Sequence, residues 1–278
     1  MLPAPWARCS LVIVVIGWLL FVVHPRRGVA QEAWGDLRGR ILVVGEAPEP
    51  ARLEVKKDIA VCGRVPLFDE SLMVGANGGL KNVVVMMLRS STVKQAPPVH
   101  PDYLSPDDLR EPVRVVLRDC RLKPRITFAV TGQSFEFHSE DEVGHHVSAW
   151  LNGNPFQPDI PPGQDQVLET REPENTPVLV VCSAHPWMTG RVLVRDEPYV
   201  AISGETGEFE IKNLPEGEWT FVFWHERGGR DKMGGYLMSL RQGCEKVGGC
   251  LGEIRVTIKD GEVTDLGTMT IAVEDLVP

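Results

Sequence analysis

The stretch that most constrains the fold of this chain runs from Pro177 to Val194 and reads PVLVVCSAHPWMTGRVLV. It predicts an apolar strand, a tight polar loop and a second apolar strand. Cys182, His185 and Met188 recur at every third position across the loop. A thiolate, an imidazole and a thioether gathered at a strand end suit a soft metal ion, and copper is the natural candidate.

A trigonal copper site with a weak axial methionine also needs a second histidine. The chain offers His145 and His146 in the strand-like run EVGHHVSAW. Neighbouring residues of a strand point to opposite faces, so only one of these imidazoles can enter the core. The candidate metal ligands are therefore Cys182, His185 and Met188, together with one histidine of this pair.

The N-terminus predicts export. Arg8 precedes the apolar run 11–23, and residues 28–30 (GVA) are the small residues that a signal peptidase prefers, so we expect a signal peptide over residues 1–30. The run is short for a membrane span; we expect none after signal cleavage, and an uncleaved anchor is the alternative. Cleavage removes three arginines and no acidic residue, which takes the formal net charge from −9 to −12. A periplasmic or secreted protein with no nucleic-acid partner is the expectation.

Export places the remaining cysteines in an oxidising compartment. Five cysteines follow residue 30, and an odd number leaves one unpaired. Cys244 and Cys250 flank a short Gly-bearing loop that a disulfide could close. Cys62 would then pair with Cys120 across a long loop, which leaves Cys182 free, although other pairings remain open.

Strand patterns dominate the rest of the 278 residues, which are enough for two domains. Residues 79–88 predict a strand buried on both faces. Short alternating segments between residues 112 and 151 predict a β-sandwich or barrel with few helices. Two strands are expected within 34–58, and a hairpin within 253–273, turning at Asp260-Gly261. The Pro-rich residues 90–111 predict a surface loop or linker.

The run CSAHPWMTGRVLV resembles the C-terminal ligand loop of the cupredoxins, and its C-x-x-H-P-aromatic-M spacing is most similar to the amicyanin type. In that family a His-Asn-Val run carries the upstream ligand and aligns here with His145-His146-Val147. The resemblance implies an all-β fold with a Greek-key cupredoxin sandwich and copper held by His145, Cys182, His185 and Met188. His185 is then expected at a rim where a redox protein partner approaches, with Pro155 and Phe156 extending an apolar patch.

A second resemblance covers residues 199–226. Their core, TGEFEIKNLPEGEW, is similar to the carboxypeptidase regulatory-like or carbohydrate-binding-like β-sandwich, a module that is not itself catalytic. The expected domains are thus a cupredoxin-like domain at 31–196 and a second small β-sandwich at 197–278. The first strands, within 34–90, belong either to the cupredoxin or to the second sandwich.

These patterns favour an exported type 1 copper protein that transfers single electrons and is not an enzyme. The alternative is a cell-envelope module that binds a glycan or a protein, with a structural or vestigial copper site. A copper oxidase is disfavoured, because four protein ligands leave no open position and the chain has only seven histidines. His225 and Glu226 could hold a second metal ion or contact a sugar; a structural strand end is the favoured interpretation.

Overall fold

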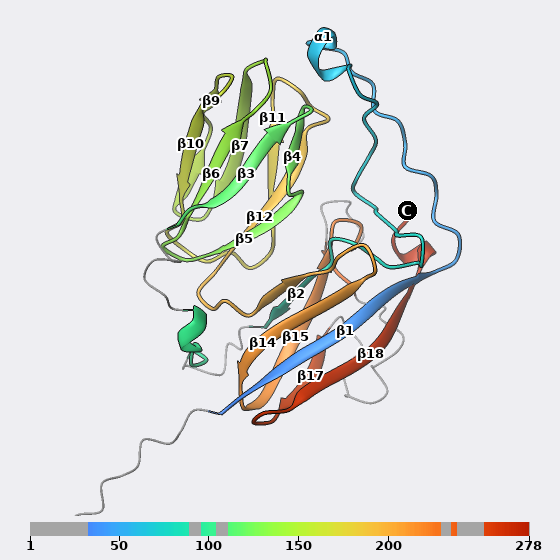
Figure 1. The fold of residues 1–278 in the computed structure, drawn as a ribbon, viewed down its shortest axis with the longest axis vertical. Helices are drawn as coiled ribbons and strands as arrows, with labels where there is room; N and C mark the ends of the chain where they lie inside the picture. Colours follow the sequence, from blue (N-terminus) through green and yellow to red (C-terminus); the bar gives the residue numbers. More distant parts are fainter. Residues whose placement is uncertain (1–32, 89–95, 104–110, 229–234, 238–252, 278) are drawn as a thin grey trace, which may run out of the picture. The chain divides into compact units, whose positions relative to one another are not determined.

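The computed structural model describes residues 33–88, 96–103, 111–228, 235–237 and 253–277. Over these ranges the fold is all-β, as predicted, with one four-residue helix, α1 (Ile59–Cys62), and two 3-10 turns, η1 (Pro101–Tyr103) and η2 (Val273–Asp275) (Figure 1). Within them no helix has the length and apolarity to cross a bilayer. The expected signal peptide and the expected Cys244–Cys250 disulfide lie outside the described residues.

Strands β3 to β12 form two sheets, which we call the central sandwich. The strand orders are β10-β6-β3-β4 in one sheet and β5-β12-β11-β7-β8 in the other, with β9 beside β7. Residues alternate between core and surface along β6, and one hydrophobic cluster draws side chains from both sheets. The strands are β3 (Val113–Arg118), β4 (Arg121–Lys123), β5 (Ile126–Val130), β6 (Ser134–Ser139), β7 (His145–Leu151), β8 (Asn154–Phe156), β9 (Asp159–Ile160), β10 (Asp165–Glu169), β11 (Val178–Cys182) and β12 (Thr189–Arg195).

The remaining strands form a second pair of sheets, the flanking sandwich. Its sheets have the orders β14-β1-β18 and β13-β2-β15-β16, with β17 also paired to β15. The first two strands of the chain thus pair with strands that follow residue 199. The strands are β1 (Trp34–Val44), β2 (Val84–Met87), β13 (Val200–Ile202), β14 (Glu208–Pro215), β15 (Gly217–His225), β16 (Gly235–Tyr236), β17 (Glu253–Ile258) and β18 (Val263–Ala272).

Strand β2 packs against both sandwiches, one with each of its faces. All four of its residues are buried, which confirms the prediction of a strand covered on both faces. Val85 and Met87 belong to the core of the flanking sandwich. Val84 and Met86 instead join a smaller cluster that includes Ile126 of β5 and residues of β12, β13 and β15. The two sandwiches therefore share apolar surface that neither could bury alone.

Two local predictions are wrong. The 253–273 segment turns near Gly261, whose φ is +66°, but β17 and β18 enter different sheets and do not pair. Both strands direct apolar side chains into the same core from opposite sides, so the chain crosses the core instead of doubling back. The second strand expected within 34–58 is also missing: residues 45–58 contain only one isolated bridge, Arg52 to Phe68.

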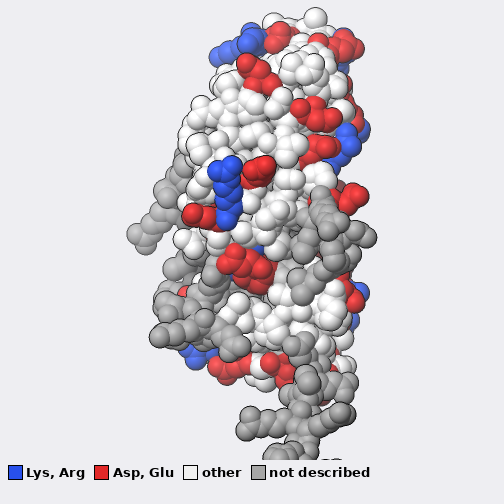
Figure 2. All heavy atoms as spheres, turned by 90° about the vertical axis from the view of Figure 1, so that its left-hand side faces the viewer, with Lys and Arg blue, Asp and Glu red and all other residues white. Residues whose placement is uncertain are grey.

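The surface carries charges of both signs. On the face shown in Figure 2, acidic side chains are scattered among fewer basic ones. This distribution agrees with the acidic balance of the whole sequence, a formal net charge of −9.

Candidate functional site

Two neighbouring strands of the central sandwich bring the expected ligands together. β7 begins at His145 and pairs with β11, which ends at Cys182, so that Cys182 lies opposite Val147. The loop that follows is held by backbone hydrogen bonds: the N–H of His185 donates to the carbonyl of Cys182 at 3.2 Å, and the N–H of Met188 donates to that of His185 at 2.8 Å. A tight turn thus folds the C-x-x-H-x-x-M spacing back onto the strand end.

Three of the expected ligands form a compact group. Nδ1 of His145 lies 3.1 Å from Nδ1 of His185, and Sγ of Cys182 lies 3.8 and 3.6 Å from these two nitrogen atoms. All three residues are buried, and Cys182 is in no disulfide. The point equidistant from the three atoms is about 2.0 Å from each, close to the usual lengths of metal–imidazole and metal–thiolate bonds. The donor set therefore fits a soft transition metal ion such as copper.

Met188, the fourth expected ligand, is 1% exposed and packs in the same hydrophobic cluster as Cys182. Its carbonyl accepts a hydrogen bond from the N–H of Cys182 at 3.0 Å, which ties the end of the loop to its beginning. The structure thus places Met188 beside the three donors through its backbone, and its role as an axial ligand remains a prediction.

The adjacent histidines divide as strand geometry requires. His145 is 2% exposed and joins the donor group. The side chain of His146 is 37% exposed, and its Nδ1 contacts Asp159 at 2.9 Å. His146 lines a surface groove of about 600 Å³ with Lys57, Asp159 and Pro161. A solvent-facing imidazole–carboxylate pair therefore stands next to the buried donors without belonging to them.

In each buried imidazole, the ring nitrogen that faces away from the donor group contacts a carboxylate. Nε2 of His145 lies 3.0 Å from Oδ2 of Asp141, and Nε2 of His185 lies 2.8 Å from Oδ2 of Asp58. Metal-binding histidines commonly donate their other ring N–H to a carboxylate, which fixes the tautomer and makes the ligand more basic. Sequence reasoning missed both residues. Asp141 had a signal, because it lies four residues before His145 in an acidic run, whereas Asp58 had none.

Without a metal, the cluster favours an imidazolium–thiolate pair. Burial alone would lower the pKa of His145, but hydrogen bonds to Asp141 and Cys182 outweigh it and raise that pKa to about 9. Burial alone would raise the pKa of Cys182, but hydrogen bonds from His145 and its neighbours lower it to about 6. Cys182 is thus prepared as a thiolate, the form that binds metals.

Of the three residues expected at an apolar rim, His185, Pro155 and Phe156, only Pro155 is exposed. His185 has no exposed surface, and Oδ2 of Asp58, the residue before α1, lies 2.8 Å from Nε2 of its ring. Phe156 is 8% exposed and stacks on Phe137 with ring centroids 5.2 Å apart, so it does not extend a surface patch. Asp58 lies far from the loop in sequence, so local spacing could not reveal its contact with His185.

The disulfide between Cys62 and Cys120 is present, as the cysteine arithmetic predicted. It joins the last residue of α1 to the turn between β3 and β4. The N–H of Cys120 donates to Oδ2 of Asp141 at 3.0 Å. One covalent link therefore stands next to both carboxylates that hold the imidazoles.

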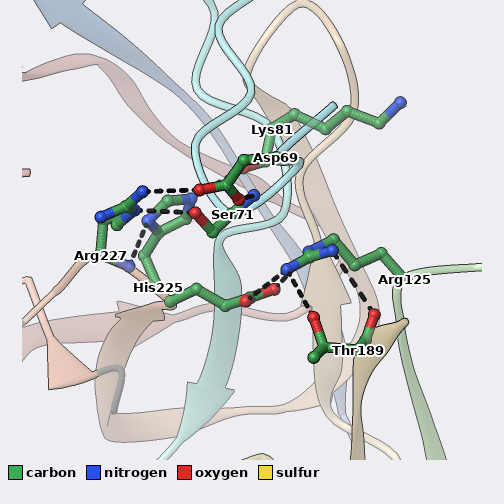
Figure 3. A network of polar contacts seen from close by, with 8 residues as sticks. Asp69, Ser71, Lys81, Arg125, Thr189, His225 and Arg227 are labelled. Atoms are coloured by element: carbon green, nitrogen blue, oxygen red, sulfur yellow. Dashed lines mark hydrogen bonds and ion pairs between the residues drawn. The ribbon is translucent and has the colours of Figure 1, made fainter. Parts of the chain in front are cut away.

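His225 and Glu226 serve the fold. Nε2 of His225 lies 3.2 Å from the carbonyl of Lys81, and Nδ1 accepts the N–H of Arg227 at 3.1 Å (Figure 3). Glu226 accepts two hydrogen bonds from Arg125, at 2.7 and 2.8 Å, and Arg125 also contacts Thr189. Both ring nitrogens and the carboxylate are thus occupied by protein groups, in agreement with the structural interpretation of this strand end.

Comparison with protein-family models finds no match, and comparison with curated proteins finds none either. Among solved structures, a Cu-containing nitrite reductase from Thermus scotoductus SA-01 is 19% identical over 39% of this chain and 25% of its own, with a TM-score of 0.28. A purple cupredoxin from Nitrosopumilus maritimus is 20% identical over 30% of this chain and 98% of its own, with a TM-score of 0.26. The oxidised state of an amicyanin variant is 18% identical over 37% of this chain and 97% of its own, with a TM-score of 0.28. The matched region spans a quarter of the nitrite reductase, and at these scores the function must be argued from the donor geometry alone.

Proposed function

We propose that this chain is an exported type 1 copper protein that passes single electrons between redox partners. The observation that carries the proposal is the triangle of His145 Nδ1, Cys182 Sγ and His185 Nδ1, three buried atoms of the types and spacing that bind one copper ion. We assign His145, Cys182 and His185 as the residues that would hold the copper ion, and Met188 as a fourth, weaker ligand.

The bound copper would supply a one-electron couple. The chain's own part is to keep the ligands in one arrangement in both oxidation states. His145 and Cys182 lie on paired strands, and the loop with His185 is tied to the strand end by backbone hydrogen bonds. Rigid elements hold a site more accurately than free loops. Burial of all three donors would also keep water away from a bound metal ion.

Export is part of the proposal. The Cys62–Cys120 disulfide supports it, since structural disulfides persist in oxidising compartments such as the periplasm. The partner we propose is another redox protein. We also propose that the central sandwich is the cupredoxin-like part and that the flanking sandwich is the carbohydrate-binding-like part.

One observation favours the alternative, an envelope module with a structural copper site. His185 is fully buried and its Nε2 contacts Asp58, so no exposed imidazole edge is available through which an electron could pass to a partner. In that case a glycan or protein would bind elsewhere, and the metal would stabilise the sandwich.

Adding Cu(II) to the purified exported protein tests the proposal. We expect an intense blue colour from thiolate-to-copper charge transfer and a reversible one-electron couple. Cys182→Ser should lose both, whereas Ser183→Ala, a change in the next residue, should keep them. A wild-type protein that stays colourless with Cu(II) would contradict the copper centre. A blue protein that exchanges electrons only very slowly with small redox dyes would favour the alternative.

A further inference from the structure

Asp58 is the one residue from outside the central sandwich whose carboxylate touches a donor imidazole among the described residues. Its Oδ2 lies 2.8 Å from Nε2 of His185, while Nδ1 of the same ring faces Cys182 at 3.6 Å. The ring therefore has one nitrogen for the metal and the other for Asp58. The role inferred for Asp58 rests on the proposed copper function.

The backbone holds Asp58 in an unusual conformation. Its φ is +51° and its ψ is 41°, in the left-handed region, where Asp and Asn are the best-tolerated residues after glycine. The carbonyl of Asp58 accepts the N–H groups of Val61 and Cys62, both at 2.9 Å, and its side chain makes no capping hydrogen bond to α1. The carboxylate is thus free of the helix and directed to His185.

The segment with Asp58 is fastened at two further points. Cys62 is bonded to Cys120, and Arg64 makes a two-pronged ion pair with Glu142 at 2.9 and 2.6 Å. Cys120 in turn donates its N–H to Asp141, the carboxylate behind the other imidazole. One disulfide therefore connects the supports of both histidines.

We propose that Asp58 is a positioning residue for the metal centre: its carboxylate keeps the proton of His185 on Nε2 so that Nδ1 faces the metal, and it closes the edge of the ring to solvent. The Cys62–Cys120 disulfide holds it in place. A carboxylate behind an imidazole makes the ligand more basic and stabilises the more highly charged metal ion, so it lowers the reduction potential. The same contact covers the route by which small molecules would reach His185.

Asp58→Asn tests the role of the charge. Asparagine tolerates the left-handed conformation and has nearly the same shape, so the segment keeps its path. Asp159→Asn is the matched control, because Asp159 forms the same kind of contact with His146, outside the donor group. We expect Asp58→Asn to weaken Cu(II) binding about 10–100-fold and to raise the reduction potential. Asp159→Asn should change neither.

Nitrogen-15 NMR of the metal-free protein gives a readout that does not depend on copper. In the wild type we expect a protonated Nε2 of His185 whose hydrogen exchanges slowly with water. Asp58→Asn should speed that exchange, and so should the double variant Cys62→Ser with Cys120→Ser, which releases the segment while Asp58 stays. Asp159→Asn should leave it unchanged.

The two proposals fail in different ways. If the wild type does not turn blue with Cu(II), the copper function fails, but the NMR comparison still decides whether Asp58 holds His185. If the wild type turns blue while Asp58→Asn matches Asp159→Asn in affinity, potential and Nε2–H exchange, the role of Asp58 is overturned and the copper function stands.

Discussion

His225 is a fully buried histidine whose two ring nitrogens contact only backbone groups. Burial disfavours its charged form and lowers its pKa to about 4, and the nearby Arg125 and Arg227 act in the same direction. In the unfolded chain the same ring titrates near 6.5. Folding therefore requires the neutral ring, and this requirement makes stability depend on pH.

Because the pKa of His225 is lower in the folded state than in the unfolded chain, the protein keeps its full stability above pH 6.5. Its free energy of unfolding then falls as the pH drops from 6.5 to about 4. The loss should amount to about 3 kcal/mol. We expect His225→Gln to be less stable than the wild type at pH 7 and to show a shallower decline over this window. Urea unfolding at several pH values measures the free energy of unfolding of both proteins. If that free energy declined equally with pH in the wild type and in His225→Gln, the prediction would be contradicted.

At the same scale, the sequence predicted that His145, Cys182 and His185 meet, but not the carboxylates that hold the two histidines. Cys182 and His185 lie three residues apart in one loop, so their meeting is a local matter. Strand alternation allows only one of His145 and His146 into the core, and the cupredoxin resemblance selected His145. Asp58 meets His185 across 127 residues, and nothing in its neighbourhood marks it. A long-range contact of one side chain leaves no periodic pattern.

Among the elements, β1 is the middle strand of its sheet and is packed tightly at Gly39. A Cβ atom built there would lie 2.8 Å from Cζ of Phe209, which is itself buried in the core of the flanking sandwich. A methyl group at this position must therefore displace an aromatic ring that has little room to move.

We expect Gly39→Ala to lower the free energy of unfolding by about 1–3 kcal/mol. Gly204→Ala is the control, since a Cβ there meets nothing within 4 Å, and its effect should stay within about 0.5 kcal/mol. Thermal denaturation of the two variants beside the wild type compares them. Equal melting temperatures would mean that Phe209 can move aside.

Element types were predictable where burial repeats along a strand, as in β6 and β2. Element partners were not. Two strands were correctly predicted within 253–273, yet β17 and β18 lie in different sheets and face one core from opposite sides. The pattern of a strand reveals its buried face and does not reveal its neighbour.

For the whole molecule, polar and apolar contacts join the two sandwiches. The shared cluster around Val84 and Ile126 is apolar. Beside it, Arg125 of the central sandwich pairs with Glu226 just after β15, with side chains 12% and 7% exposed. Removing one partner of so buried a pair leaves the other charge without compensation.

Glu226→Gln should therefore destabilise the protein by about 3 kcal/mol or more, and the double variant Arg125→Met with Glu226→Leu should recover much of that loss. Because the sandwiches share a cluster, we also expect one unfolding transition when tryptophan fluorescence and far-UV circular dichroism are followed together. Two separate transitions, or a Glu226→Gln protein as stable as the wild type, would contradict this account of the junction.

The strand order also determines which sheets can form first while the chain is being synthesised. β1 lies between β14 and β18, and its Arg38 bonds Asp265, 227 residues further on. The ten strands from β3 to β12 need no partner beyond residue 195 to complete their own sheets. Because the chain is made from its N-terminus onward, the central sandwich can form its sheets before residues 196–278 are available. β1 cannot pair until β14 and β18 have been made.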